Sequence, residues 1–163
     1  MKSSKKLLLL AMLIVPWLTL PLLGRKNIKK YFLSALLMCI FTKGIDVFGR
    51  KKNWWEFYKG IRPLNSMDML NLGPYFIMSF WMLRLTYGRF LLYLLSNSLL
   101  HYWFIFKGGL KFTSQHKILS LVKLTKFQYL IVDFCRALLL YAFQFSKDWI
   151  SNRRRLNKKE PVS

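Results

Sequence analysis

Four polar side chains recur at every fourth position of an otherwise apolar segment: Arg89, Tyr93, Asn97 and His101. Residues spaced by four lie on one slowly drifting face of an α-helix. In hydrocarbon such groups seek partners on neighbouring helices, so this ridge is typical of interhelical hydrogen bonding. It also suits the lining of a polar cavity or proton path, with His101 close to Asp46 or Asp133. The sequence leaves both interpretations open.

Two acid–base pairs fall inside apolar segments, each at an i,i+3 spacing: Lys43 with Asp46, and Asp133 with Arg136. This spacing places both members on one helix face, where opposite charges can neutralise each other. Ionisable residues within membrane segments are nevertheless candidates for ion or proton pathways. Together with the polar ridge, these pairs complete the set of candidate functional residues.

No catalytic, cofactor-binding or metal-binding motif accompanies these residues. The sequence contains no zinc-protease, P-loop, dinucleotide-binding or nucleophile-elbow pattern. It holds only 6 Asp and Glu and 2 His, whereas an intramembrane enzyme would need clusters of such residues. Cys39 and Cys135 are single and far apart, which predicts two small buried apolar residues rather than a metal or redox site. We therefore expect no enzyme activity, no cofactor and no metal.

The composition indicates an integral membrane protein. Hydrophobic residues make up 54% of the 163 residues, while 27 Lys and Arg stand against 6 Asp and Glu. A soluble nucleic-acid-binding protein shares the charge but not the long apolar runs. Basic loops between apolar segments explain both features, so the sequence predicts lipid partners and no nucleic acid.

The elements that would position these residues are predicted to be membrane helices, of which the first spans about residues 7–23. Its uncharged run reaches about 25 Å, near the lower limit for a span. A cleaved signal peptide is the alternative, but no small-residue cleavage site follows and Arg25 comes next. Pro16 and Pro21 should bend this helix or end it early. A second helix is expected over about residues 30–48.

The stretch WMLRLTYGRFLLYL, residues 81–94, lies within the longest apolar run. A single helix through this run would hold Arg84 and Arg89 near the bilayer centre, where each costs about 3 kcal/mol. Gly88 instead permits a tight turn that brings both arginines to a membrane surface. We therefore predict a hairpin of two helices, over about residues 67–87 and 89–106.

The last apolar segment, about residues 117–147, admits two placements. Wound as a helix, it gathers its polar residues on one stripe beside a wide apolar arc. It can lie in the membrane interface, or span with the stripe facing other helices. Residues 129–145 are barely long enough to span and contain two charges, which favours the interface.

The expected fold is therefore all-α, with four transmembrane helices plus a C-terminal amphipathic or fifth membrane helix. Residues 1–147 should form one multi-pass membrane domain, and residues 148–163 a basic cytoplasmic tail. Cytoplasmic loops are enriched in Lys and Arg. With four spans and the last helix on the inner face, 19 basic residues lie inside and 6 outside. Both termini are thus expected in the cytoplasm, with the basic inner face against anionic lipid headgroups.

A basic loop with four aromatic residues follows the second predicted helix: Trp54, Trp55, Phe57 and Tyr58. Aromatic rings beside lysines suit the lipid headgroup layer, because the ring faces meet acyl chains while amines meet water and phosphate. The same composition suits single-stranded nucleic acid. Its place between two apolar segments favours the membrane interpretation.

The ordered segments NWWEFY, LGPYF, LTYGRF and YLLSN resemble small uncharacterised multi-pass membrane proteins of spore-forming Gram-positive bacteria, over about residues 27–145. The pattern TYG[KR]F is the most specific part of this resemblance. The resemblance implies a plasma-membrane location and no established activity. It carries no catalytic or binding residue over to this chain.

Two functions remain open at this point. A non-enzymatic protein acting through lipid, membrane-protein or homo-oligomeric partners fits the absence of catalytic motifs and the basic inner face. A small transporter or channel subunit would use the polar ridge and the intramembrane charges. The position of His101 relative to Asp46 and Asp133 separates the two. Convergence on one cavity favours transport, and scattered surfaces argue against it.

Overall fold

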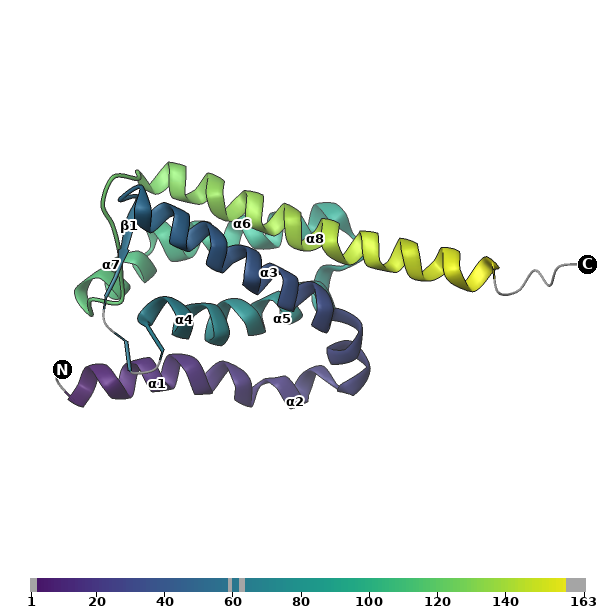
Figure 1. Ribbon diagram of the computed structural model, residues 1–163, viewed down its shortest axis with the longest axis horizontal. Helices are drawn as coiled ribbons and strands as arrows, with labels where there is room; N and C mark the ends of the chain where they lie inside the picture. Colours follow the sequence, from purple (N-terminus) through teal and green to yellow (C-terminus); the bar gives the residue numbers. More distant parts are fainter. Residues whose placement is uncertain (1–2, 59, 62–63, 158–163) are drawn as a thin grey trace, which may run out of the picture.

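The computed structural model describes residues 3–58, 60–61 and 64–157, and they are predominantly helical, which confirms the all-α class (Figure 1). The elements in chain order are α1 (Ser3–Leu18), α2 (Leu20–Leu23), α3 (Arg25–Lys51), β1 (Trp55–Phe57), α4 (Ser66–Leu70), η1 (Asn71–Tyr75), α5 (Phe76–Thr86), α6 (Phe90–Phe106), α7 (Gly109–Gln115), β2 (Leu119–Leu121) and α8 (Lys126–Asn157).

The long helices form an antiparallel bundle. The segments α1–α2, α3, α4–α5, α6 and α8 run along the long axis of the molecule (Figure 1). The connections from α3 to α4 and from α6 to α8 lie at one end, together with the start of α1. The α2–α3 and α5–α6 turns lie at the other end, and α8 continues beyond them.

The first membrane helix is interrupted where its prolines predict an interruption. Pro16 lies in the last turn of α1, which ends at Leu18, and Pro21 lies in the first turn of α2. A proline nitrogen carries no hydrogen, so the helical hydrogen-bond ladder cannot continue through it unchanged. Gly24, with φ of 76°, then turns the chain into α3.

The predicted hairpin at Gly88 is confirmed. Helix α5 ends at Thr86 and α6 begins at Phe90, and Gly88 takes a φ of 93°, which non-glycine residues rarely adopt. Arg84 and Arg89 are both exposed beside this turn. The Arg84 guanidinium donates a hydrogen bond to the backbone carbonyl of Leu22 and lies over the Trp81 ring.

The third predicted helix contains a π-helical turn. The chain is continuously helical from Ser66 to Thr86, but residues 71–75 form η1. Gly73 and Pro74 predict a kink or restart at this place, and Pro74 accounts for the widened turn because it cannot donate the regular i−4 hydrogen bond. Gly73 also permits close packing, since a Cβ there would lie 2.5 Å from the Met12 carbonyl oxygen of α1.

The predicted C-terminal helix over residues 117–147 is wrong at both boundaries. Residues 119–121 form β2, which pairs antiparallel with β1. Helix α8 starts only at Lys126, after a capping box in which Thr125 and Gln128 each accept a hydrogen bond from the other's backbone N–H. It then continues to Asn157, through residues expected to be a tail. Residues 158–163 of that predicted tail lie outside the described residues.

The distribution of polarity is that of a membrane protein. Four large apolar side chains along one face of α6 are 63–73% exposed: Leu91, Leu95, Leu99 and Trp103. Charged and amide side chains are buried instead, among them Asp46, Asp133, Arg136 and Gln144. Within the described residues, three stretches are long and apolar enough to cross a membrane: Lys6–Leu23, Arg25–Lys51 and Lys126–Arg154. Helix α6 is apolar but shorter.

Candidate functional site

The interior of the bundle holds four ionisable side chains, which we call the charge cluster: Asp46 of α3, His101 of α6, and Asp133 and Arg136 of α8. The Arg136 guanidinium bridges two helices, because Nη2 donates to Asp46 Oδ1 at 2.6 Å while Nη1 donates to Asp133 Oδ1 at 3.2 Å. His101 Nδ1 lies 3.2 Å from the second carboxylate oxygen of Asp133.

The cluster is enclosed by protein. Asp46, Asp133 and Arg136 are buried, and Asp133 has no exposed surface at all. The His101 side chain is 16% exposed. Charges in so apolar an environment are strongly destabilised unless each finds an opposite charge and hydrogen bonds. The pairing of α3 with α8 through Arg136 is therefore a structural requirement as well as a candidate functional feature.

The π-helical turn supplies a further polar partner. Asn71, the first residue of η1, donates from Nδ2 to Asp46 Oδ2 at 3.1 Å. Tyr75, the last residue of η1, places its hydroxyl 3.1 Å from that of Tyr129 on α8. Such π-turns occur often at functional sites, because the extra residue per turn redirects side chains. Here the turn presents one amide and one phenol to the inside of the bundle.

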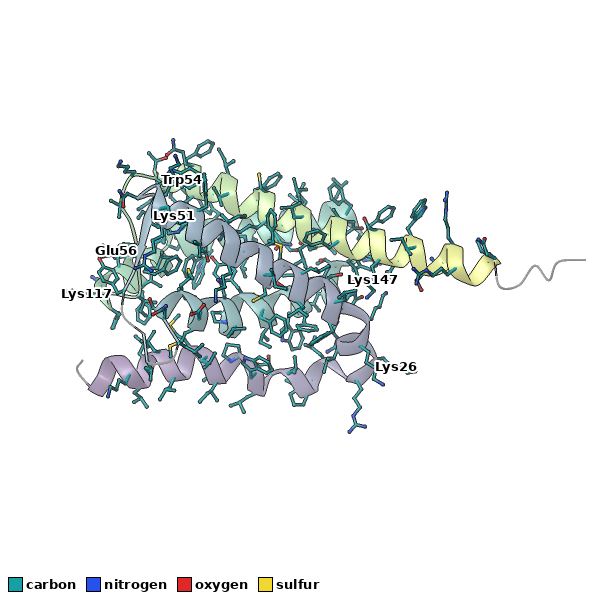
Figure 2. All side chains as sticks on the ribbon, viewed as in Figure 1. Lys26, Lys51, Trp54, Glu56, Lys117 and Lys147 are labelled. Atoms are coloured by element: carbon teal, nitrogen blue, oxygen red, sulfur yellow. The ribbon has the colours of Figure 1, made fainter. Side chains whose placement is uncertain are left out.

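Trp55 packs against the cluster from the side of β1. Its indole Nε1 donates to the backbone carbonyl of Asp46 at 3.2 Å, and Arg136 Cζ lies 5.6 Å from its ring centroid. Gly49 makes room for the indole, since a Cβ there would lie 2.3 Å from a Trp55 ring atom. Trp55 is buried, so the expectation that this tryptophan faces lipid headgroups is wrong. Figure 2 shows its neighbour Trp54 at the same end of the bundle as Lys51.

Three buried polar atoms around the cluster make no hydrogen bond to any described residue: Asn71 Oδ1, Asp133 Oδ2 and Arg136 Nε. For Asp133 Oδ2 this holds although His101 Nδ1 is within ion-pair distance, because that contact does not meet the geometry of a hydrogen bond. Buried polar atoms are rarely left without a partner, and such groups tend to mark functional positions.

An apolar cavity of about 300 Å³ adjoins the charge cluster. Side chains from α3, α5, α6 and α8 form its walls, among them Met38, Phe76, Met82, Leu100, Phe104 and Leu140. His101 and Arg136 also line it. A second cavity of about 200 Å³ lies between α6 and α8, and its walls share Asn97, His101 and Ala137 with the first. His101 thus contributes to both cavities and to the cluster.

The polar ridge of α6 is used for contacts between helices. The buried Tyr93 hydroxyl donates to the Ala137 carbonyl of α8 at 2.7 Å, and His101 contacts Asp133 of the same helix. Asn97 donates back to the Tyr93 carbonyl within α6 at 2.8 Å. Arg89 stands apart from these contacts, exposed at the hairpin turn. The prediction of an interhelical hydrogen bond is therefore confirmed for Tyr93, and His101 contacts α8 at ion-pair distance.

The predicted pairing of Lys43 with Asp46 is wrong. Lys43 Nζ bonds Asp68 of α4 at 2.9 Å, and its side chain is 57% exposed. Asp46 binds Arg136 of α8 and Asn71 of η1 instead. The predicted pair of Asp133 and Arg136 is confirmed. An i,i+3 spacing makes a contact possible, but here a guanidinium from another helix pairs with the buried carboxylate through a charge-assisted hydrogen bond.

The two cysteines do not share one environment. Cys39 is half-buried, whereas Cys135 is exposed on α8, so the expectation of two buried cysteines is wrong for Cys135. Among the described residues no group of three or more His, Cys, Asp or Glu side chains is arranged to hold a metal ion.

Several residues of the site escaped sequence interpretation, namely Trp55, Asn71, Tyr75 and Tyr129. Asn71 offered a signal, because it is an amide inside an apolar segment two residues before a Gly-Pro pair. The tyrosines offered none that distinguishes them from the other 6 tyrosines of the chain. Comparison with protein families, curated proteins and solved structures finds no match for this chain.

Proposed function

We propose that the chain is a multi-pass plasma-membrane protein in which α1–α2, α3, α4–α5, α6 and α8 all cross the bilayer. The support lies in α8, which packs lengthwise against α3 and α6 rather than across the end of the bundle (Figure 1). A helix lying in the interface would let headgroups and water solvate Asp133 and Arg136, yet both are buried. This arrangement replaces four spans plus an interfacial helix.

A chain with five spans has its N-terminus and its C-terminus on opposite sides of the membrane. Figure 2 shows Lys26 and Lys147 toward one end of the bundle, and Lys51, Glu56 and Lys117 toward the other. Basic residues thus occupy both ends, which weakens the charge bias that predicted a cytoplasmic location for both termini. Under this proposal only one terminus is cytoplasmic.

Single cysteines test the number of spans. In a background with Cys39 and Cys135 replaced by Ala, we would introduce Cys in place of Lys26, Lys51 or Ser151, all exposed. Five spans require Lys26→Cys and Ser151→Cys to react with an impermeant thiol reagent from the same side of intact cells, and Lys51→Cys from the other. If Ser151→Cys instead behaves like Lys51→Cys, α8 does not cross the membrane.

For the role of the protein, we propose that it holds a small apolar or amphipathic molecule of the bilayer in the cavity of about 300 Å³ and is not an enzyme. That cavity carries the proposal. Ligand pockets are typically apolar with a few polar groups that fix orientation, and about 300 Å³ is the lower end of their usual range. His101 and Arg136 supply the polar groups here, so a single polar end of the molecule would face them.

Anionic lipids at the surface fit the same proposal. The last turns of α8 carry exposed Arg153 and Arg154 next to exposed Trp149 and Ile150. Basic side chains beside aromatic and aliphatic ones favour an anionic headgroup layer. This surface would anchor the end of α8 and would leave the cavity free for the bound molecule.

Two neighbouring leucines of α6 allow a matched test of the cavity. Leu100 lines the cavity, whereas Leu99 is 70% exposed on the outer face. In liposomes containing a photoactivatable fatty acid, we expect Leu100→Trp to reduce crosslinking to cavity-lining peptides about tenfold, or about 1.4 kcal/mol. Leu99→Trp should leave the yield unchanged. Equal yields in both variants would contradict a ligand in this cavity.

Transport is the second candidate function. His101, Asp46 and Asp133 meet in one cluster beside the cavity, and their convergence is the arrangement that favours transport over scattered interhelical contacts. Intramembrane acids and histidines commonly form proton relays in transporters. Net movement of the bound molecule across proteoliposomes would be the distinguishing measurement.

A further inference from the structure

The charge cluster is short of one positive charge. Asp46 and Asp133 bring two negative charges, and Arg136 brings one positive charge. Among the described residues, the elements packed around the cluster add no further cation, since Lys43 bonds Asp68 and is exposed, while Asn71, Tyr75 and Tyr129 are neutral. With both carboxylates ionised, a neutral His101 would therefore leave one excess negative charge inside the bundle, which is strongly unfavourable in an apolar environment.

From this arrangement we infer that the charge cluster is a proton-binding site, with the proton carried by His101 opposite Asp133. The fully buried Asp133 Oδ2, which has no hydrogen-bond partner, faces His101 Nδ1 at 3.2 Å. An imidazolium at this position balances the charge of the second carboxylate at ion-pair distance. Of the four side chains of the cluster, His101 is the one that gains a positive charge when it takes up a proton.

The proton reaches His101 from the cavity side. His101 lines both cavities and keeps part of its surface exposed, while the two carboxylates are enclosed behind it. A hydronium ion in the cavity gives its proton to the free nitrogen lone pair of the neutral imidazole and leaves as water. Release is the reverse step. When His101 takes up a proton, the wall that it contributes to both cavities changes from neutral to cationic.

A proton fits this site better than a metal cation. Among the described residues, no cluster of three or more His, Cys, Asp and Glu side chains is suited to a metal. Sodium and calcium bind through shells of several oxygen ligands, whereas three of the four carboxylate oxygens here already accept hydrogen bonds from Arg136 or Asn71.

Nitrogen-15 NMR of the full chain in nanodiscs tests the inference, because imidazolium and neutral imidazole give distinct signals. The chain has 2 His, so His116→Gln leaves His101 as the only one. At pH 7 we expect an imidazolium signal in this background. Adding Asp133→Asn removes the excess charge, and His101 should then be neutral. Asp148→Asn, on the same helix but outside the cluster, is the matched control and should keep the imidazolium.

Each outcome decides the matter. A neutral His101 at pH 7 in the His116→Gln background overturns the inference, and that measurement does not depend on the folding of Asp133→Asn. An imidazolium that persists in a folded Asp133→Asn variant overturns the role of Asp133. Replacing sodium by choline should change nothing. A rise in the imidazolium signal on sodium removal would show that the site takes a metal cation instead.

Discussion

Arg136→Gln is expected to lower the free energy of unfolding in detergent by about 3–5 kcal/mol, because it leaves two buried carboxylates without their shared cation. Arg136 is the only described side chain that bonds both Asp46 and Asp133, and it links α3 to α8. Glutamine keeps much of the volume and two donors but supplies no charge. Denaturation followed by circular dichroism would measure the loss.

The controls for Arg136→Gln separate burial from charge in general. Arg89→Gln removes an exposed arginine at the hairpin and should cost well under 1 kcal/mol. The double variant with Asp133→Asn should recover only part of the loss, since Asp46 stays buried and unpaired, and adding Asp46→Asn should recover more. A loss below about 1 kcal/mol for Arg136→Gln would show that the cluster is solvated, as in an interfacial α8.

Asp133→Asn alone should be far milder than Arg136→Gln. If Asp133 and Arg136 formed an isolated pair on α8, replacing Asp133 would leave Arg136 without a carboxylate partner. In the structure Arg136 retains Asp46 at 2.6 Å, so its charge stays balanced. A carboxamide also keeps an oxygen that can accept the Arg136 hydrogen bond. This difference between the two single variants follows from the contact between Arg136 and Asp46. The two residues are 90 positions apart in the sequence, so no local spacing predicts their contact.

The helices could be predicted because local chemistry determines them. Gly88 beside two arginines sets the hairpin, and Pro16 and Pro21 break the first helix, as composition alone indicates. The start of α8 was missed because residues 119–121, Leu-Ser-Leu, fit either a helix or a strand. Their strand partner is β1, which lies more than 60 residues earlier in the chain.

Only part of the candidate site could be predicted from the sequence. Asp133 with Arg136 and the Tyr93–His101 ridge depend on helical spacing, and both were found. The partner of Asp46 was not, because several basic residues compete for it and only tertiary packing selects among them. Asn71 depends on a π-turn, where the extra residue per turn rotates the side chain away from the regular periodicity.

Trp55→Ala is the second change with a large expected effect, at about 3–5 kcal/mol of unfolding free energy. The indole is almost fully buried, packs edge-on against Tyr129 and donates to the Asp46 carbonyl. Its removal opens a cavity directly beneath Arg136, where water could reach the charge cluster. Trp54→Ala changes a neighbouring tryptophan that is only half-buried, and it should lower the unfolding free energy clearly less.

A second route to the same defect uses Gly49. A valine there would bring its Cβ to within 2.3 Å of the Trp55 ring, so the indole must leave its site although Trp55 itself is unchanged. Gly49→Val should therefore destabilise about as much as Trp55→Ala, and combining the two should cost much less than their sum. By contrast, Gly44→Ala on the same helix meets no atom within 4 Å and should be neutral or slightly stabilising. Additive losses for Gly49→Val and Trp55→Ala would mean that the two residues stabilise the bundle independently, and that Trp55 does not depend on Gly49 for its place beside Arg136.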